Sequence, residues 1–257
     1  MIANHLKARI RAGKPSFGAL LNFADPLVAE MMASVGYEWL MVDTEHGPID
    51  LATLATMFAT ITRYPVAPLV RVPTLNADEV KRVLDAGAWG VMAPMMKTRE
   101  DAELLVAACK YPPRGVRSLG SGRFAMSFKT DPQTYFQRAN DEVMVIVQIE
   151  HADAIKNIDA MLSVPGVDAC YVGPNDLMAS MGLAPSLEPP HREFEEAMQV
   201  VLHTAKKHGV AAGIHCATPA TVNRRIAEGW LMTGLVNDQR LLQSAAQAAR
   251  AAVTTPE

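Results

Sequence analysis

The chain alternates between short apolar runs and helical patterns, and eight such runs occur along it. In five places an amphipathic stretch reaches a glycine that is followed at once by an apolar run. Glycine commonly closes a helix in the left-handed conformation before the chain turns into a strand. The runs are continuous rather than alternating, as in parallel strands buried on both faces. The predicted strands lie within 17–22, 36–43, 66–71, 87–94, 143–150, 166–173, 209–216 and 229–236.

Helical patterns fill the intervals between these runs. In 76–87, Asn76 and Glu79 form a start that resembles a capping box, and in 190–208 apolar residues recur at helical spacing. Eight strands alternating with helices over 257 residues predict an α/β fold, a TIM (β/α)8 barrel, as one domain spanning 1–257. A doubly wound open sheet is the alternative. It is less favoured because no G-x-G-x-x-G motif opens a helix after the first strand.

Composition narrows the class of protein. The chain is 49% hydrophobic and 20% charged with a net charge of −3, and it has no clustered basic face for nucleic acid. No apolar run approaches the roughly 20 residues of a membrane span. Three cysteines far apart favour free thiols in a reducing cytoplasm. Residues 111–140 are too long for a plain connection, and we expect them to cover the mouth of the barrel.

Four polar residues occupy the carboxyl ends of predicted strands. His46 and Asp176 follow such runs, and Arg71 and Glu150 end them. In parallel α/β folds, catalytic residues gather at that end of the sheet. A base, a cation and two carboxylates there predict a metal-assisted active site.

Glu150 and Asp176 are the candidate metal ligands. Two carboxylates suit a hard divalent cation, Mg²⁺ or Mn²⁺, better than Zn²⁺. The alternative is two surface carboxylates that cap helices, since Asp176 also stands near the start of a predicted helix.

His46 is the candidate base, and Asp43 is placed to hold its ring and set its tautomer. The alternative for His46 is a cap for the next helix. Arg71 is the candidate clamp for a carboxylate or an enolate, because a buried guanidinium is costly unless it faces an anion. The alternative is an internal salt bridge with Glu45 or Glu150.

Two further candidates carry less weight. Lys97 follows the fourth strand and could form a Schiff base, but the charged helix start after it favours a solvated side chain. His215 and Cys216 end the seventh strand, and adjacent strand residues point to opposite faces, which argues against a shared zinc ion. His215 is instead predicted to line the pocket.

Six segments in this order resemble the metal-dependent (class II) pyruvate aldolases of the 4-hydroxy-2-oxoheptanedioate / 2-dehydro-3-deoxyglucarate aldolase family. The resemblance runs from about residue 5 to 250. The segments are 42-VDTEHGP-48, 71-RVP-73, 85-DAGAWGVMAP-94, 111-YPPRGVRSLG-120, 148-QIE-150 and 173-GPNDL-177.

The resemblance implies a barrel of the phosphoenolpyruvate/pyruvate-binding superfamily that cleaves a 4-hydroxy-2-oxo acid into pyruvate and an aldehyde. It implies that Glu150 and Asp176 bind Mg²⁺ or Mn²⁺, with Co²⁺ among other possible ions. Arg71 would contact the keto oxygen and stabilise the enolate, and His46 paired with Asp43 would shuttle the proton.

The resemblance also implies contacts beyond these groups. Gln148 and the backbone around Asn175 and Asp176 would hold the pyruvyl group. The family is usually a homohexamer, a trimer of dimers in which the last helix is exchanged, and Asp85 matches a position that reaches the neighbour's site. Independently of the resemblance, we expect the aldehyde half to meet a variable rim made of 21–23, the 118–128 loop, His215 and residues from a neighbouring subunit.

Some positions depart from the family pattern and put substrate choice in doubt rather than reaction type. They are Ser118, Asn175, Met178 and the segment 236-VND-238. Three other readings remain: a CoA-ester lyase or other enzyme of this barrel superfamily, a non-catalytic oxo-acid-binding protein, and Schiff-base chemistry through Lys97.

Overall fold

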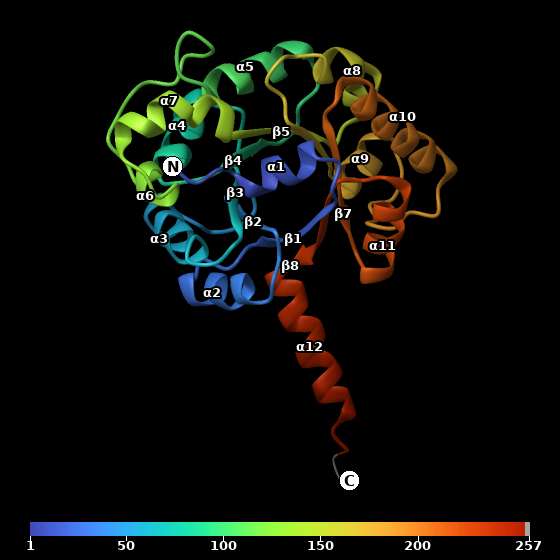
Figure 1. The fold of residues 1–257 in the computed structure, drawn as a ribbon. Helices are drawn as coiled ribbons and strands as arrows, with labels where there is room; N and C mark the ends of the chain where they lie inside the picture. Colours follow the sequence, from blue (N-terminus) through green and yellow to red (C-terminus); the bar gives the residue numbers. More distant parts are fainter. Residues whose placement is uncertain (255–257) are drawn as a thin grey trace.

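The computed structural model describes residues 1–254 as a closed barrel of eight parallel strands, each hydrogen-bonded to the next, with β8 returning to β1 (Figure 1). The predicted (β/α)8 barrel is therefore confirmed. The strands are β1 Ser16–Leu21, β2 Trp39–Asp43, β3 Ala67–Arg71, β4 Gly90–Ala93, β5 Met144–Ile149, β6 Ala169–Val172, β7 Ala211–Cys216 and β8 Met232–Asn237.

Helices surround the strands in the described range. They are α1 His5–Arg11, α2 Pro26–Ser34, α3 Leu51–Ile61, α4 Ala77–Asp85, α5 Arg99–Cys109, α6 Phe124–Ser127, α7 Pro132–Glu142, α8 Ala152–Leu162, α9 Pro174–Ser180, α10 Arg192–His208, α11 Pro219–Glu228 and α12 Asp238–Ala252. Asn76 caps α4 as predicted, but Glu79 bonds Thr74 rather than completing a capping box.

Glycines set where helices end and strands begin. Gly209 and Gly229 adopt φ values of 66° and 103° after α10 and α11 and send the chain into β7 and β8. This left-handed conformation carries no steric cost for glycine. The strands that follow are buried along nearly their whole length, so the apolar runs become the wall of the barrel.

Two aromatic rings fill the barrel interior below its carboxyl end. Trp39 and Tyr171 meet edge to face with centroids 6.1 Å apart. Glycines make room for them: a Cβ at Gly213 would lie 2.7 Å from the Tyr171 ring, and a Cβ at Gly18 or Gly234 would overlap Trp39 or Tyr171. The pair forms a floor, and the polar residues lie above it.

The expectation that residues 111–140 cover the mouth is wrong. The segment follows α5, which runs back toward the amino ends of the strands, and it stays at that end. The Trp89 Nε1–H, just before β4, donates to Ser127 Oγ at 3.0 Å, and Phe128 stacks on the Trp89 ring at 4.8 Å. The 118–128 loop therefore contributes nothing to this chain's mouth.

The two terminal helices differ in their contacts. In Figure 1, α1 lies across the centre of the ring of strands, whereas α12 extends away from the barrel. Asp238 is the one buried residue of α12 in the described part of the chain. Across residues 1–254, no helix has the length and apolar character that a membrane span requires.

Candidate active site

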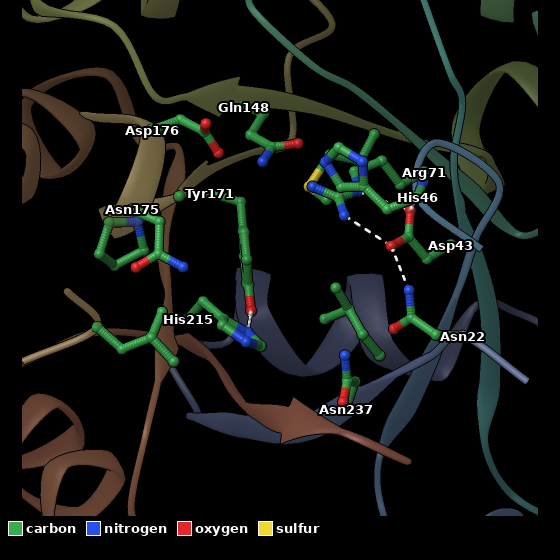
Figure 2. A pocket seen from close by; sticks show the side chains of 15 residues that line it. Asn22, Asp43, His46, Arg71, Gln148, Tyr171, Asn175, Asp176, His215 and Asn237 are labelled. Carbon is green, nitrogen blue, oxygen red and sulfur yellow. Dashed lines mark hydrogen bonds and ion pairs between the residues drawn. The ribbon is translucent and has the colours of Figure 1, made fainter. Parts of the chain in front are cut away.

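A cavity of about 230 Å³ opens at the carboxyl end of the barrel (Figure 2). Most of the predicted site residues meet there, although they come from separate strands and loops. The cavity is lined by Leu20, Asn22, Asp43, His46, Arg71, Met92, Gln148, Tyr171, Gly173, Pro174, Asn175, Asp176, Leu187, His215 and Asn237.

A buried ion pair between Arg71 and Asp43 forms one wall of the cavity. Arg71 Nε and Nη2 donate to the two Asp43 oxygens at 2.9 and 2.7 Å, a bidentate fork. Burial alone would raise the pKa of Asp43, but the hydrogen bonds and charge of Arg71 hold that pKa below its usual value. Asp43 is thus a fixed anion that orients the guanidinium at the cavity.

The predicted pairing of Asp43 with the His46 ring is not observed. Asp43 instead accepts Arg71, the Asn22 side chain at 2.8 Å, and the backbone N–H groups of Glu45 and His46. These donors occupy the acceptor positions of the Asp43 carboxylate, so none remains for the His46 ring. The His46 side chain is 64% exposed, and its Nε2 lies 3.9 Å from Glu45 Oε2.

Glu45 is a third carboxylate of the site, which the sequence suggested only as a salt-bridge alternative. Its Oε2 lies 3.1 Å from Arg71 Nη1. The predicted ion pair with Glu45 is thus confirmed, with Asp43 as the second partner of Arg71. Burial and the nearby charges of Asp43 and Asp176 raise the pKa of Glu45, against the effect of Arg71.

Glu150 lies at the end of β5 in a setting that disfavours its charge. The backbone N–H of Met95 donates to Oε1 at 2.7 Å, and the Gln148 amide donates to Oε2. Burial, reinforced by the charges of Glu45 and Asp176, raises the pKa of Glu150 to about 7. A positively charged ligand would stabilise the ionised form of a carboxylate in this setting.

The backbone around Glu150 is shaped to reach it. Met95 adopts a positive φ of 54°, which is strained for a side chain of this kind, and its N–H points at the Glu150 carboxylate. On the other side, a Cβ at Gly173 would lie 2.8 Å from Glu150 Oε2 and 3.0 Å from Gln148 Nε2. Glycine at 173 therefore leaves room for the carboxylate and the Gln148 amide beside the cavity.

Asn175 and Asp176 enter the cavity from the first turn of α9. In residues 1–254, no hydrogen bond engages the Asp176 carboxylate, and Figure 2 shows it near Gln148. No group of three or more His, Cys, Asp and Glu side chains in that range forms a ready metal cluster. Glu150 and Asp176 nevertheless supply hard oxygen donors near an excess of negative charge, which fits a divalent cation.

Tyr171 and His215 form a pair at the bottom of the cavity. Tyr171 Oη lies 3.3 Å from His215 Nδ1 (Figure 2). Burial, with the nearby charge of Arg71, lowers the pKa of His215 to about 4, so the imidazole is neutral near pH 7. The prediction that His215 lines the pocket is confirmed, and Cys216 is buried away from it.

No role was assigned to Tyr171 from the sequence, which included Asn22 only within the expected rim 21–23 and Asn237 only within the segment 236–238. Asn22 and Asn237 stand at the ends of the first and last strands, so the rule that located Arg71 would have found them. Asp238 supports that side, because its carboxylate accepts the backbone N–H groups of Asn22 and Phe23 at 2.9 and 3.1 Å. Tyr171 had no comparable signal, since it lies inside a continuous apolar run.

Three predicted residues are absent from the cavity lining: Glu150, which lies beside it and bonds the lining residue Gln148, and Asp85 and Lys97, which lie elsewhere. Asp85 pairs with the buried Arg117 at 2.8 Å and lines a separate surface hollow with Arg82 and Arg123. Lys97 follows β4, where its backbone N–H bonds Asp101 at the start of α5, and it does not line the cavity. Schiff-base chemistry at Lys97 therefore lacks structural support.

An eight-stranded parallel barrel with charged and polar groups gathered at its carboxyl end defines a barrel enzyme. Comparisons with known proteins make this more specific. The HpcH/HpaI aldolase/citrate lyase family matches residues 17–245. The chain is 36% identical over 245 residues to the 4-hydroxy-2-oxo-heptane-1,7-dioate aldolase of Escherichia coli, with 95% of this chain and 93% of the relative covered.

Solved structures agree with the sequence comparison. An HpcH/HpaI aldolase/citrate lyase family protein from Burkholderia cenocepacia J2315 superposes with a TM-score of 0.89 at 35% identity, covering 96% of this chain and 98% of that one. An HpcH/HpaI aldolase from Desulfitobacterium hafniense DCB-2 gives 0.89 at 31%, covering 98% and 97%. The chain belongs to the HpcH/HpaI aldolase/citrate lyase family and is a carbon–carbon lyase.

Proposed function

We propose that this enzyme cleaves a 4-hydroxy-2-oxo acid reversibly into pyruvate and an aldehyde. The observation that carries the proposal is the buried Arg71 fork, fixed by Asp43 at the wall of a cavity that Asp176 also lines, with Glu150 beside it and bonded to the lining residue Gln148. Such preorganised groups stabilise charge that develops during a reaction without reorganising. Family membership supplies the reaction class.

In the cleavage direction, the bond between C3 and C4 of the substrate breaks and its electron pair stays on C3. The resulting enolate carries its charge on the C2 oxygen, beside Arg71. His46 takes the proton of the C4 hydroxyl, directly or through a water, as C4 becomes the aldehyde carbon. The exposed His46 ring suits exchange with solvent, and a proton delivered to C3 then completes pyruvate.

Glu150 and Asp176 are the residues that would hold the divalent cation, with Mg²⁺ or Mn²⁺ preferred and Co²⁺ a further candidate. When bound, it supplies Lewis-acid polarisation of the C2 carbonyl. Gln148 and Asn175, which line the same side, would hold the pyruvyl group. The raised pKa of Glu150, about 7, supports this assignment because a nearby cation would offset the burial of its charge.

The direct test is pyruvate release from a panel of 4-hydroxy-2-oxo acids, followed through lactate dehydrogenase. The enzyme is stripped with EDTA and then given Mg²⁺, Mn²⁺ or Co²⁺. Activity lost with EDTA and restored by metal is expected. Activity indifferent to EDTA would overturn the metal assignment, and absence of pyruvate release with every substrate and metal would overturn the aldolase proposal.

We also propose a homo-oligomer in which α12 packs on a second copy, within a hexamer built as a trimer of dimers. Leu27 and Met31 on α2 and Val35 at its C-cap are exposed apolar residues at helical spacing, and α12 exposes Leu242. In that assembly Asp85 would reach the neighbour's site. Light scattering tests it: a monomeric wild type contradicts the proposal.

The buried free thiols support a cytoplasmic location.

A further inference from the structure

The half of the cavity opposite the proposed metal-binding carboxylates is uncharged, and it combines polar side chains with the apolar Leu20 of β1. β7, β8 and β1 contribute His215, Asn237 and Asn22 to it, and Tyr171 rises between them from the floor (Figure 2). Glu150, Asp176 and Gln148 come from the β5–β6 side, where the pyruvyl half is proposed to bind. The remainder of a substrate must therefore extend toward β7, β8 and β1.

Hydrogen-bonding capacity on this side is left unused by the protein. Asn22 is 6% exposed and its Nδ2 donates to Asp43, but its buried Oδ1 has no hydrogen-bond partner in the described chain. His215 bonds Tyr171 through Nδ1, which leaves Nε2 as a donor or acceptor according to the tautomer. Unpartnered buried polar atoms are costly, so a polar ligand group that reaches them is favoured.

The charge of the cavity argues against a second carboxylate on the substrate. Arg71 is the one lysine or arginine among the lining residues within 1–254, and both Asp43 and Glu45 already engage it. The carboxylates of Asp43 and Glu45 contact this guanidinium, Glu150 lies near it, and Asp176 lies near Glu45 and Glu150. A divalent cation between Glu150 and Asp176 would leave the formal charge negative, and an acidic aldehyde would add to it.

We infer that the aldehyde half of the substrate is a neutral hydroxylated aldehyde, recognised by hydrogen bonds from Asn22, Asn237 and the His215–Tyr171 pair. This rests on the proposed aldol function. It differs from the substrate in the name of the Escherichia coli relative, whose heptane-1,7-dioate carries a second carboxylate. His215 has a free ring nitrogen at the cavity. Substitution of His215 therefore best tests whether hydrogen bonds on this side of the cavity determine the choice of aldehyde.

The experiment follows condensation of pyruvate with three aldehydes: lactaldehyde, propanal and succinic semialdehyde. Lactaldehyde differs from propanal by one hydroxyl, which isolates the hydrogen bond. We expect kcat/KM for lactaldehyde to exceed that for propanal by about tenfold or more, because a site that hydrogen-bonds a hydroxyl rejects the analogue that lacks it. Succinic semialdehyde should be the poorest of the three. A preference for it overturns the inference.

Variants at His215 separate recognition from intrinsic aldehyde reactivity. His215→Leu should bring the lactaldehyde to propanal ratio down by roughly tenfold, the value of one hydrogen bond of this kind. His215→Gln retains a hydrogen-bonding group and should keep most of the preference. His203→Leu, at an exposed position on α10, should leave the ratio unchanged. An unaltered ratio in both His215 variants contradicts the role of His215.

A second readout distinguishes this inference from the proposed function. Exchange of the pyruvate methyl protons in D₂O, followed by NMR, reports enolate formation without any aldehyde. Exchange in the wild type with no discrimination among aldehydes overturns the substrate class and leaves the aldolase proposal standing. Absence of exchange and of condensation in the metal-loaded enzyme overturns both.

Discussion

At the amino end of the barrel, buried lysines are matched by acceptors of the chain, whereas at the carboxyl end the carboxylates outnumber the positive charges near them. Lys7 Nζ lies 2.9 Å from Asp168 Oδ2 and donates to the Val143 carbonyl at 3.0 Å. Lys110 Nζ donates to the carbonyls of Asn140 and Val143 at 2.9 and 2.7 Å. Each charged group there receives at least two protein contacts.

The carboxyl end contrasts with this arrangement. Glu45 and Glu150 lie near a single guanidinium, that of Arg71, and Asp176 lies near both of these carboxylates. Burial raises the pKa of Glu45 and of Glu150. The buried Gln148 Oε1 has no hydrogen-bond partner in the described chain. Satisfied polar groups stabilise a fold, and unsatisfied ones cost stability unless a ligand completes them. The difference therefore assigns stability to one end and ligand binding to the other.

The largest effect is expected for Arg71→Lys. Lysine keeps a positive charge beside Asp43 but loses the planar fork and its fixed direction. We expect kcat/KM to fall by about 10³-fold, equivalent to about 4 kcal/mol of transition-state stabilisation, and unfolding to change by much less. Steady-state kinetics and urea denaturation measure the two quantities.

Arg225→Lys is the matched control for Arg71. Arg225 lies on α11, is buried, and forms a bidentate pair with Glu195 at 2.8 and 2.9 Å, far from the cavity lining. Its replacement should lower stability and leave kcat/KM unchanged. Similar activity losses in both variants would mean that Arg71 acts only through folding.

Next in size is Asp168→Asn at the amino end. The change leaves Lys7 buried without its carboxylate, and breaking a buried pair costs about 3 kcal/mol or more. Activity of the folded enzyme should be unaffected. Asp153→Asn, which breaks an exposed pair with Lys156, should cost under about 1 kcal/mol. Equal costs for the two variants would contradict the stabilising role of the amino end.

The fold was largely predictable because parallel strands leave a strong local signal. Continuous apolar runs marked all eight strands, five of them opened by glycine, since each strand is buried on both faces. The segment 111–140 was misplaced because its course depends on contacts distant in sequence, such as Phe128 on Trp89. Composition shows that such a segment is irregular, but it does not show which end of the barrel the segment covers.

The site was predictable where a residue ends a strand, as with Arg71 and His215. The site was not predictable where several donors compete for one acceptor. Asp43 had five candidate donor groups nearby, and the fork of Arg71, with Asn22 and two backbone amides, excluded the His46 ring. Tyr171 was missed because barrel register, rather than local sequence, determines which residue of β6 points inward.

A smaller effect is expected for Gly173→Ala. The added Cβ would lie 2.8 Å from Glu150 Oε2, so the carboxylate must shift. A displacement of this kind should lower kcat/KM by about 10- to 100-fold with little change in stability. Gly120→Ala, where the nearest neighbour of the Cβ is 3.7 Å away, is the control. Unchanged activity in Gly173→Ala would show that the position of Glu150 is not critical.

The smallest effect is expected in the pH dependence of stability, which reports how completely the amino end of the barrel compensates the charge of Lys110. Burial lowers the pKa of Lys110 from 10.5 to about 8, so folding disfavours the charged form although two carbonyls accept its protons. Because the folded pKa lies below the unfolded one, the penalty is fully present below pH 8 and disappears as pH rises toward 10.5.

Lys110→Met should therefore remove a rise in stability between pH 8 and 10.5 that the wild type shows, worth at most about 3 kcal/mol by linkage. The free energy of unfolding of both proteins is measured by urea denaturation at pH 7.5 and 9.5. The difference between the two proteins cancels the contribution of other titrating groups. Lys14→Met, at an exposed position, should leave the pH dependence of the wild type intact. The same pH dependence in Lys110→Met would mean that the two carbonyls compensate its charge fully, and that the amino end carries no electrostatic cost at all.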